Sequence, residues 1–232
     1  MRKVLLFFAL FVFLSTQPVF AQFGGRTQQG PRFYGNFKPV VGAWAEYQMK
    51  AATKEPPTKM KIAIVGKEGD SYWYENVMDG GQGRSVMKML VSGDPNDKKS
   101  VRRMIMKHGN DQALEMPVTG MMGNQPGKGM HQPKGKMIDK GMESVTVPAG
   151  TFQAHHMQYQ DEGTVVDTWV SEKVPPYGMV KSSSKDFDMV LTGYGTGAKT
   201  LITETPKQFQ MPKMPQGMPP GMMPPVMPPK GQ

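Results

Sequence analysis

A period of two in the hydrophobic residues runs through most of this chain and constrains its fold more than any other feature. In "KMKIAIVGKE" (59–68), Met60, Ile62 and Ile64 fall on one face, as expected for a strand with one buried side. Similar short runs recur, separated by Gly, Pro, Asn or Asp residues that favour turns. The expected strands are residues 40–50, 59–68, 71–78, 84–91, 101–108, 143–148, 151–160, 164–171, 178–185, 187–194 and 197–204.

This pattern predicts an all-β fold. No segment carries apolar residues at helical spacing for three turns, and only "DQALEM" (111–116) is compatible with a single helical turn. About ten short strands with such turns predict a curved antiparallel sheet that forms a half-barrel or an unclosed barrel. We expect residues 39–204 to form it as a single β domain.

Three segments lack the strand period. Residues 22–38 are rich in Gly, Gln and Arg, which predicts a flexible N-terminal segment. Residues 117–142 are expected to be a long, disordered loop of low complexity. Residues 205–232 are rich in Met and Pro and are expected to be a disordered tail.

The first residues indicate export. Arg2 and Lys3 precede an apolar run over residues 4–14, and a small-residue site ends at Ala21, which is typical of a secretory signal peptide over residues 1–21. The run is too short to cross a bilayer, and no later segment is long and apolar enough, so no transmembrane segment is expected. The mature protein is therefore predicted to be periplasmic or secreted, and it has no cysteine for a disulfide.

The net charge of +9 is unevenly placed. Residues 22–38, 116–142 and 206–232 hold ten basic residues against one acid, Asp139, whereas the rest of the mature chain is close to neutral. Basic, flexible segments on a neutral domain suit contact with anionic lipid or polysaccharide surfaces. Together with export, this distribution argues against nucleic-acid binding.

The stretch "ESVTVPAGTFQAHHMQYQ" (143–160) predicts a hairpin that turns at residues 148–150. His155 and His156 are adjacent in the outgoing strand, so they point to opposite faces and make a poor metal chelate. Packing or hydrogen bonding is the more ordinary role for such histidines.

"VTVPAGTFQAHHM" together with "DTWVSEKVPPYGMVK" (167–181) resembles exported β proteins of the outer-membrane lipoprotein carrier superfamily. The specific part of the resemblance covers about residues 143–185. It implies a curved antiparallel sheet, an unclosed barrel with an apolar concave face. Carriers of that superfamily plug the barrel with helices, and no helix of useful length is apparent here.

Four aromatic residues are candidates for lining that concave face. They are Trp73, Tyr159, Trp169 and Phe187. They would hold an apolar or lipidic ligand or contact another envelope protein, and the alternative is that they belong to the core.

The 23 methionines offer a second kind of site. Thioethers and imidazole are ligands for Cu(I) or Ag(I), and a copper site would use Met87, Met89, Met104, Met106 and His108 if the two strands present the same face. Methionine is also an adaptable core residue, so we prefer no metal and no other cofactor.

No nucleophile elbow and no zinc-like cluster is visible, so the chain is not expected to be an enzyme. The favoured hypothesis is an exported, non-enzymatic β-sheet binding or interaction module of the cell envelope. A soft-metal protein and a hydrolase that the sequence does not reveal are the alternatives.

Overall fold

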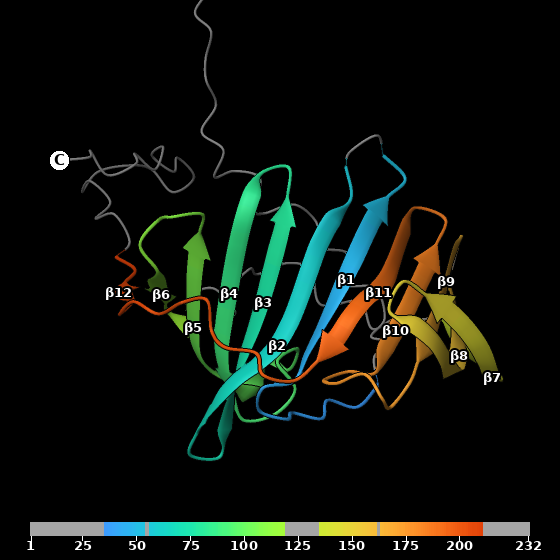
Figure 1. Cartoon of the computed structure of the whole chain (residues 1–232), viewed down its shortest axis with the longest axis horizontal. Helices are drawn as coiled ribbons and strands as arrows, with labels where there is room; N and C mark the ends of the chain where they lie inside the picture. The colour runs from blue at the N-terminus through green and yellow to red at the C-terminus, as the bar shows by residue number, and fades with distance from the viewer. Residues whose placement is uncertain (1–34, 54–55, 119–134, 162, 211–232) are drawn as a thin grey trace, which may run out of the picture. The chain divides into compact units, whose positions relative to one another are not determined.

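Twelve strands account for nearly all regular structure in this computed structural model, which describes residues 35–53, 56–118, 135–161 and 163–210. They are β1 (Trp44–Ala51), β2 (Thr58–Glu68), β3 (Ser71–Gly80), β4 (Gly83–Val91), β5 (Val101–His108), β6 (Leu114–Met116), β7 (Lys136–Val147), β8 (Gly150–Asp161), β9 (Thr164–Val170), β10 (Met179–Ser184), β11 (Phe187–Gly195) and β12 (Lys207–Gln208) (Figure 1). A short 3-10 turn, η2 (Lys98–Ser100), precedes β5. These elements all belong to one unit, Gly30–Phe209.

The strands form one sheet in the order β12-β6-β5-β4-β3-β2-β1-β11-β10-β9-β8-β7. Two antiparallel meanders, β1 to β6 and β7 to β11, are joined where β1 pairs with β11. The sole parallel pairing among the described strands is that of β12 with β6. The sheet is curved and its two edges do not pair with each other, so the predicted all-β, unclosed architecture is confirmed.

One face of the sheet, called the inner face here, carries the main core. Alternate residues of β1, β2, β3 and β11 point into it, as do residues of β10, because successive side chains of a strand take opposite faces. The most deeply buried of them include Tyr47, Ile64, Val180 and Leu191. The hydroxyl of Tyr47 donates to the carbonyl oxygen of Met179 at 3.2 Å, so its polar end is satisfied within the core.

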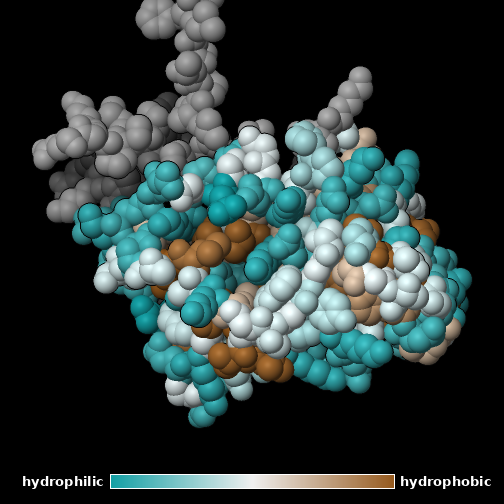
Figure 2. All heavy atoms as spheres, in the orientation of Figure 1, coloured by the Kyte–Doolittle hydropathy of each residue, from teal (hydrophilic) through white to brown (hydrophobic). Residues whose placement is uncertain are grey.

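The opposite, outer face is crossed by the chain between β11 and β12, which Figure 1 shows passing in front of β2 to β5. Ile202 of this segment packs with Val77, Val86 and Ile105 in a second, small core. Figure 2 shows the same side of the molecule as a mainly hydrophilic surface with separate small hydrophobic patches.

A buried carboxylate fastens this crossing segment to the sheet. Glu75 of β3 is only 2 % exposed, and it accepts hydrogen bonds from the hydroxyl of Thr200 at 2.6 Å and from the backbone N–H of Leu201 at 3.1 Å. Farther along, Lys107 and Glu204 form an ion pair at 2.6 Å. The segment then reaches the edge strand β6, where β12 begins.

Several expected boundaries are wrong. Residues 136–142 were predicted as loop but form the first part of β7, and residues 197–204 were predicted as a strand but form the irregular crossing segment. Within residues 111–116, Leu114–Met116 form β6, and no helical turn is present. Lys207 and Gln208, predicted as tail, form β12.

The end of the predicted flexible N-terminal segment is also part of the fold. Phe37 packs against the main core, and the backbone N–H of Lys38 donates to the carbonyl oxygen of Pro176 at 2.9 Å. The predicted signal peptide, residues 22–34, most of the loop and the tail beyond residue 210 lie outside the described residues.

Candidate functional site

Methionines line the inner face where β2 to β6 lie side by side. Met87 lies opposite Met106 and Met89 lies opposite Met104 across β4 and β5, so the two strands do present the same face. Met104 also lies opposite Met116 of β6, and Met60 lies opposite Met78 across β2 and β3. The methionine face is defined here as Met60, Met78, Met87, Met106 and Met116, all of which are half-buried.

The residues of the predicted copper site therefore divide into two groups. Met89 and Met104 are 4 % and 7 % exposed and lie in the main core. Met87 and Met106 are half-buried, and His108 lies opposite Ser85 at the exposed end of β5. In the described residues, no group of three or more His, Cys, Asp or Glu side chains could hold a metal ion.

Asn76 adds a polar atom to this apolar wall. It lies between Tyr74 and Met78 on β3 and opposite Met87 of β4. Its side-chain oxygen is buried and accepts no hydrogen bond in the described structure. A buried acceptor without a donor costs ~1–3 kcal/mol, so this oxygen is suited to accept a hydrogen bond from a bound molecule or a water.

An aromatic cluster covers the middle of the inner face. Phe37 lies 5.3 Å from Tyr177 and 6.4 Å from Tyr74 between ring centroids, and the two tyrosines are 6.4 Å apart. The hydroxyl of Tyr177 donates to the carboxylate of Asp94 at 3.2 Å. The loop before β5 and the chain before β10 are thereby held to the N-terminal residues.

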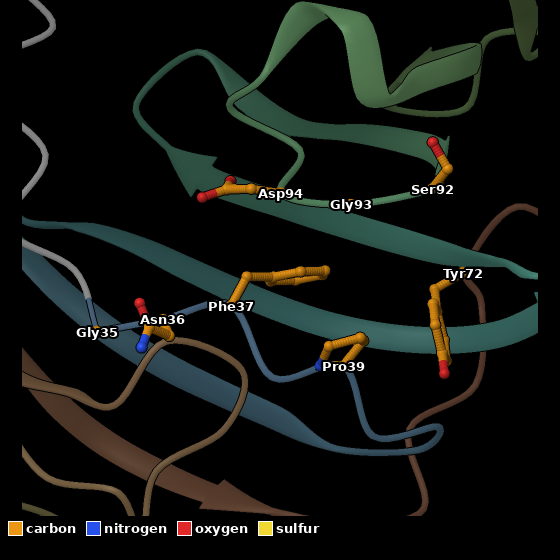
Figure 3. Close-up of a pocket in the computed structure, with 8 residues that line it drawn as sticks. All are labelled: Gly35, Asn36, Phe37, Pro39, Tyr72, Ser92, Gly93 and Asp94. Carbon is orange, nitrogen blue, oxygen red and sulfur yellow. The ribbon is translucent and has the colours of Figure 1, made fainter.

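Beside this cluster lies a cleft of about 470 Å³. Figure 3 shows Phe37 and Pro39 on one chain segment facing the loop Ser92–Asp94, with Tyr72 at one end. Its volume is within the range of small-ligand sites, about 300–1,000 Å³. Aromatic rings and polar groups alternate around it, whereas the methionine face is almost wholly apolar.

The four predicted aromatic ligands are spread over the sheet rather than gathered in one place. Trp73 lies on the outer face of β3, where Lys88 and Arg103 are 4.8 and 5.3 Å from its ring centroid. Four strands of the sheet separate β3 from β9, which carries Trp169. Tyr159 is buried in β8, and Phe187 is 37 % exposed at the start of β11.

Charged side chains of the outer face, Lys88, Arg103 and Glu75, set the electrostatics around Trp73. Burial lowers the pKa of Lys88, while the nearby carboxylate of Glu75 opposes that shift. An ammonium group over an indole ring and beside a buried carboxylate is an ordinary stabilising arrangement. The ring of Trp73 is thus already contacted by two cations of the same chain, Lys88 and Arg103.

The two histidines face opposite sides of β8, as predicted. His155 contacts Asp139 at 2.6 Å, and the ring of His156 stacks on Trp169 with centroids 4.4 Å apart. The Nε2 atom of His156 is 2.6 Å from Asp167, and its Nδ1 atom is 3.5 Å from Glu143. His156 of β8 thus contacts carboxylates of both neighbouring strands, Glu143 of β7 and Asp167 of β9.

Sequence reasoning missed Phe37, Asn76 and Tyr177. Phe37 falls in a Gly-rich segment. Asn76 lies two residues from both Tyr74 and Met78, and this spacing could have predicted that the three side chains share one face of the strand. Tyr177 follows two prolines in an expected turn, where an aromatic core residue is hard to anticipate.

Comparisons with known proteins do not assign a family. No family model and no curated protein sequence matches the chain. No helix in the described ranges is both long and apolar enough to span a membrane.

Three solved structures show weak likeness in fold. One is a protein of Bacteroides fragilis described as exported with a YmcC-like fold (11 % identity, TM-score 0.34), which matches over 70 % of this chain and 100 % of its own. Another is described as a lipoprotein of Parabacteroides distasonis (12 % identity, TM-score 0.35, 71 % and 100 %). The third is MucB in complex with MucA(peri) (9 % identity, TM-score 0.40), where the match spans 68 % of this chain and about half, 51 %, of the other.

At these scores the likenesses assign neither a family nor a function. The all-β sheet implied by the resemblance to lipoprotein carriers is confirmed, whereas membership of that superfamily stays a prediction.

Proposed function

We propose that the protein is an exported, non-enzymatic binding module of the cell envelope that holds a flexible apolar chain, such as a lipid acyl chain, on its methionine face. The observation that carries this proposal is the set of five half-buried methionines on one face of β2 to β6. The predicted signal peptide supports the location in the envelope.

The chemistry of the face favours a flexible apolar ligand. Methionine side chains are unbranched and polarisable, so they adjust to a chain that has no fixed shape. Covering half-exposed apolar side chains contributes ~25 cal/mol per Å² of apolar surface removed from water. Asn76 would accept a hydrogen bond from a hydroxyl or amide group near the apolar part of the ligand.

The test is a titration of the purified protein with a fluorescent fatty acid. Gln matches Met in length, so Met87→Gln with Met106→Gln makes the face polar with little change in shape. The matched control is Val165→Thr, an apolar-to-polar change of equal shape at an exposed position of β9. We expect saturable binding that the double variant weakens by at least tenfold and the control leaves unchanged; non-saturable binding, or equal affinity in all three proteins, would contradict the proposal.

Cu(I) binding is the second candidate, favoured by the placement of Met87, Met106 and His108 on one face. With Met89 and Met104 in the core, only three of the five predicted copper ligands remain outside it, so we expect weak binding by the domain. A Cu(I) competition titration on protein ending at residue 210 tests this, because β12 is then retained. A tight one-to-one complex that His108→Ala abolishes would favour copper over the apolar ligand.

A further inference from the structure

Within the described part of the chain, the edge strand β7 pairs with another strand on one side only. Eleven of its twelve residues pair with β8, and β7 is the last strand in the described sheet order. The opposite edge is covered by the chain itself, because the backbone N–H groups of Lys207 and Phe209 donate to the carbonyl oxygens of Ala113 and Glu115. An open strand edge readily pairs with another strand.

Two large apolar side chains on this edge are exposed to solvent. Met137 and Met142 are 44 % and 64 % exposed, although an exposed edge strand in a monomer ordinarily carries polar or charged residues. Both lie on the same face, since Met137 is opposite Tyr159 and Met142 is opposite His155 of β8.

The sequence of this edge, "KMIDKGME" (136–143), is complementary to itself when it is reversed. The register with β8 shifts between Asp139 and Gly141, so Lys140 is an extra, bulged residue. Without it, seven paired positions remain and Asp139 is their centre. A two-fold axis at Asp139 places Lys136 opposite Glu143 and Met137 opposite Met142 of a second copy.

The directions of the side chains along β7 agree with this register. Lys136 is opposite Gln160 and Glu143 is opposite Ala154, six residues apart on β8, so the two charged side chains share one face. A two-fold axis perpendicular to the sheet keeps that face, and opposite charges meet on both sides of the axis. At the axis, the bulged Lys140 supplies positive charge next to Asp139 in each copy, and the Nε2 atom of His155 contacts the Asp139 carboxylate.

We propose that the mature protein forms a two-fold symmetric dimer in which residues 136–143 of β7 pair antiparallel with the same residues of a second copy. The dimer would cover Met137 and Met142 and remove the open edge. An unrelated strand has no reason to match the mirrored charges of this segment, which is why a second copy is the occupant. The inference does not depend on the ligand proposed for the inner face.

The experiment is sedimentation equilibrium on the full mature chain, residues 22–232, with two single charge reversals and their mixture. In a homodimer of either variant, Lys136→Glu or Glu143→Lys, positions 136 and 143 carry like charges. These positions face each other at two places across the interface. In an equimolar mixture, a dimer of one copy of each variant again has opposite charges at both contacts. Lys173→Glu, at an exposed loop position, is the matched control for the change in net charge.

We expect a dimer for the wild type and the control, dimer dissociation constants raised about tenfold for each single variant, and recovery of the dimer in the mixture. Circular dichroism shows that each variant is folded, which matters for Glu143→Lys because Glu143 also accepts a hydrogen bond from the indole N–H of Trp169. A monomeric wild type, single variants that dimerise like the wild type, or a mixture no more dimeric than its components would each overturn the proposal.

Discussion

Glu75 on β3 and Thr200 in the crossing segment are joined by a hydrogen bond of 2.6 Å across 125 residues of sequence. The carboxylate also accepts from the N–H of Leu201, so one side chain orders the segment that leads to β12. A buried carboxylate needs such donors, because burial without them is costly.

Replacing Glu75 with Gln should therefore destabilise the fold. Hydrogen bonds to a charged group contribute ~1.5–3 kcal/mol, and Gln retains only one acceptor oxygen and no charge, so we expect a loss of ~1–3 kcal/mol in the free energy of unfolding. Urea unfolding measures it. Glu172→Gln is the control, since Glu172 forms only an exposed ion pair with Lys38 and should change stability by less than ~1 kcal/mol.

Substitutions at Met104 test whether this methionine is a core residue or a metal ligand. Because it is 7 % exposed among apolar neighbours, Met104→Leu should cost less than ~1.5 kcal/mol, whereas Met104→Ala should cost ~2–5 kcal/mol through the cavity that it leaves. Val165→Ala, at an exposed position of β9, should have little effect. Equal effects of Met104→Ala and Val165→Ala on unfolding would show that Met104 is not packed as described.

Acid should loosen the edge formed by β6 and β12. A hydrogen bond from Arg103 lowers the pKa of Glu115, and one from Lys107 lowers the pKa of Glu204. Groups with a lowered pKa stabilise the fold above the usual Glu value of about 4.3, and that contribution is lost as the pH falls through the folded-state value.

The urea concentration at the midpoint of unfolding should accordingly decrease as the pH is lowered from 5 to 3. The decrease should be smaller in the double variant Glu115→Gln with Glu204→Gln. The comparison with wild type isolates these two carboxyl groups from the others. The same decrease in both proteins would mean that neither ion pair contributes.

Asn76 is predicted to weaken the unliganded fold. Replacing its buried, unsatisfied oxygen with the apolar side chain of Leu should leave stability unchanged or raise it by ~1 kcal/mol, unlike most substitutions at half-buried positions. Thermal unfolding with and without the fluorescent fatty acid gives the result. A loss of more than ~2 kcal/mol would indicate that Asn76 is satisfied in the native protein.

The hairpins of the first half could be predicted because turn chemistry and alternation agree there. Gly69 adopts a positive φ of 57° between β2 and β3, as the expected turn requires. By contrast, residues 136–142 were missed because an edge strand with both faces largely exposed has no apolar period to detect. Residues 197–204 show such a period, but the N–H of Leu201 binds the carboxylate of Glu75 rather than a neighbouring strand.

The candidate site depended on register, which sequence does not specify. That Met87 faces Met106 follows from the pairing of β4 with β5, which shifts between Leu90 and Val91. The predicted aromatic set failed to gather because Trp73 and Trp169 lie on strands far apart in the sheet order. Such long-range placement comes from the joining of the two meanders by β1 and β11 and has no local signal.

The most direct test of the account is methyl NMR of protein labelled at its methionine methyl groups, titrated with a fatty acid. We predict that the resonances of Met60, Met78, Met87, Met106 and Met116 shift together and saturate with one binding constant. Met137 on the open edge β7 is the internal reference and should not move in parallel with them. Shifts confined to methionines outside the inner face, or no saturable shift at all, would contradict the proposal that this face binds an apolar chain.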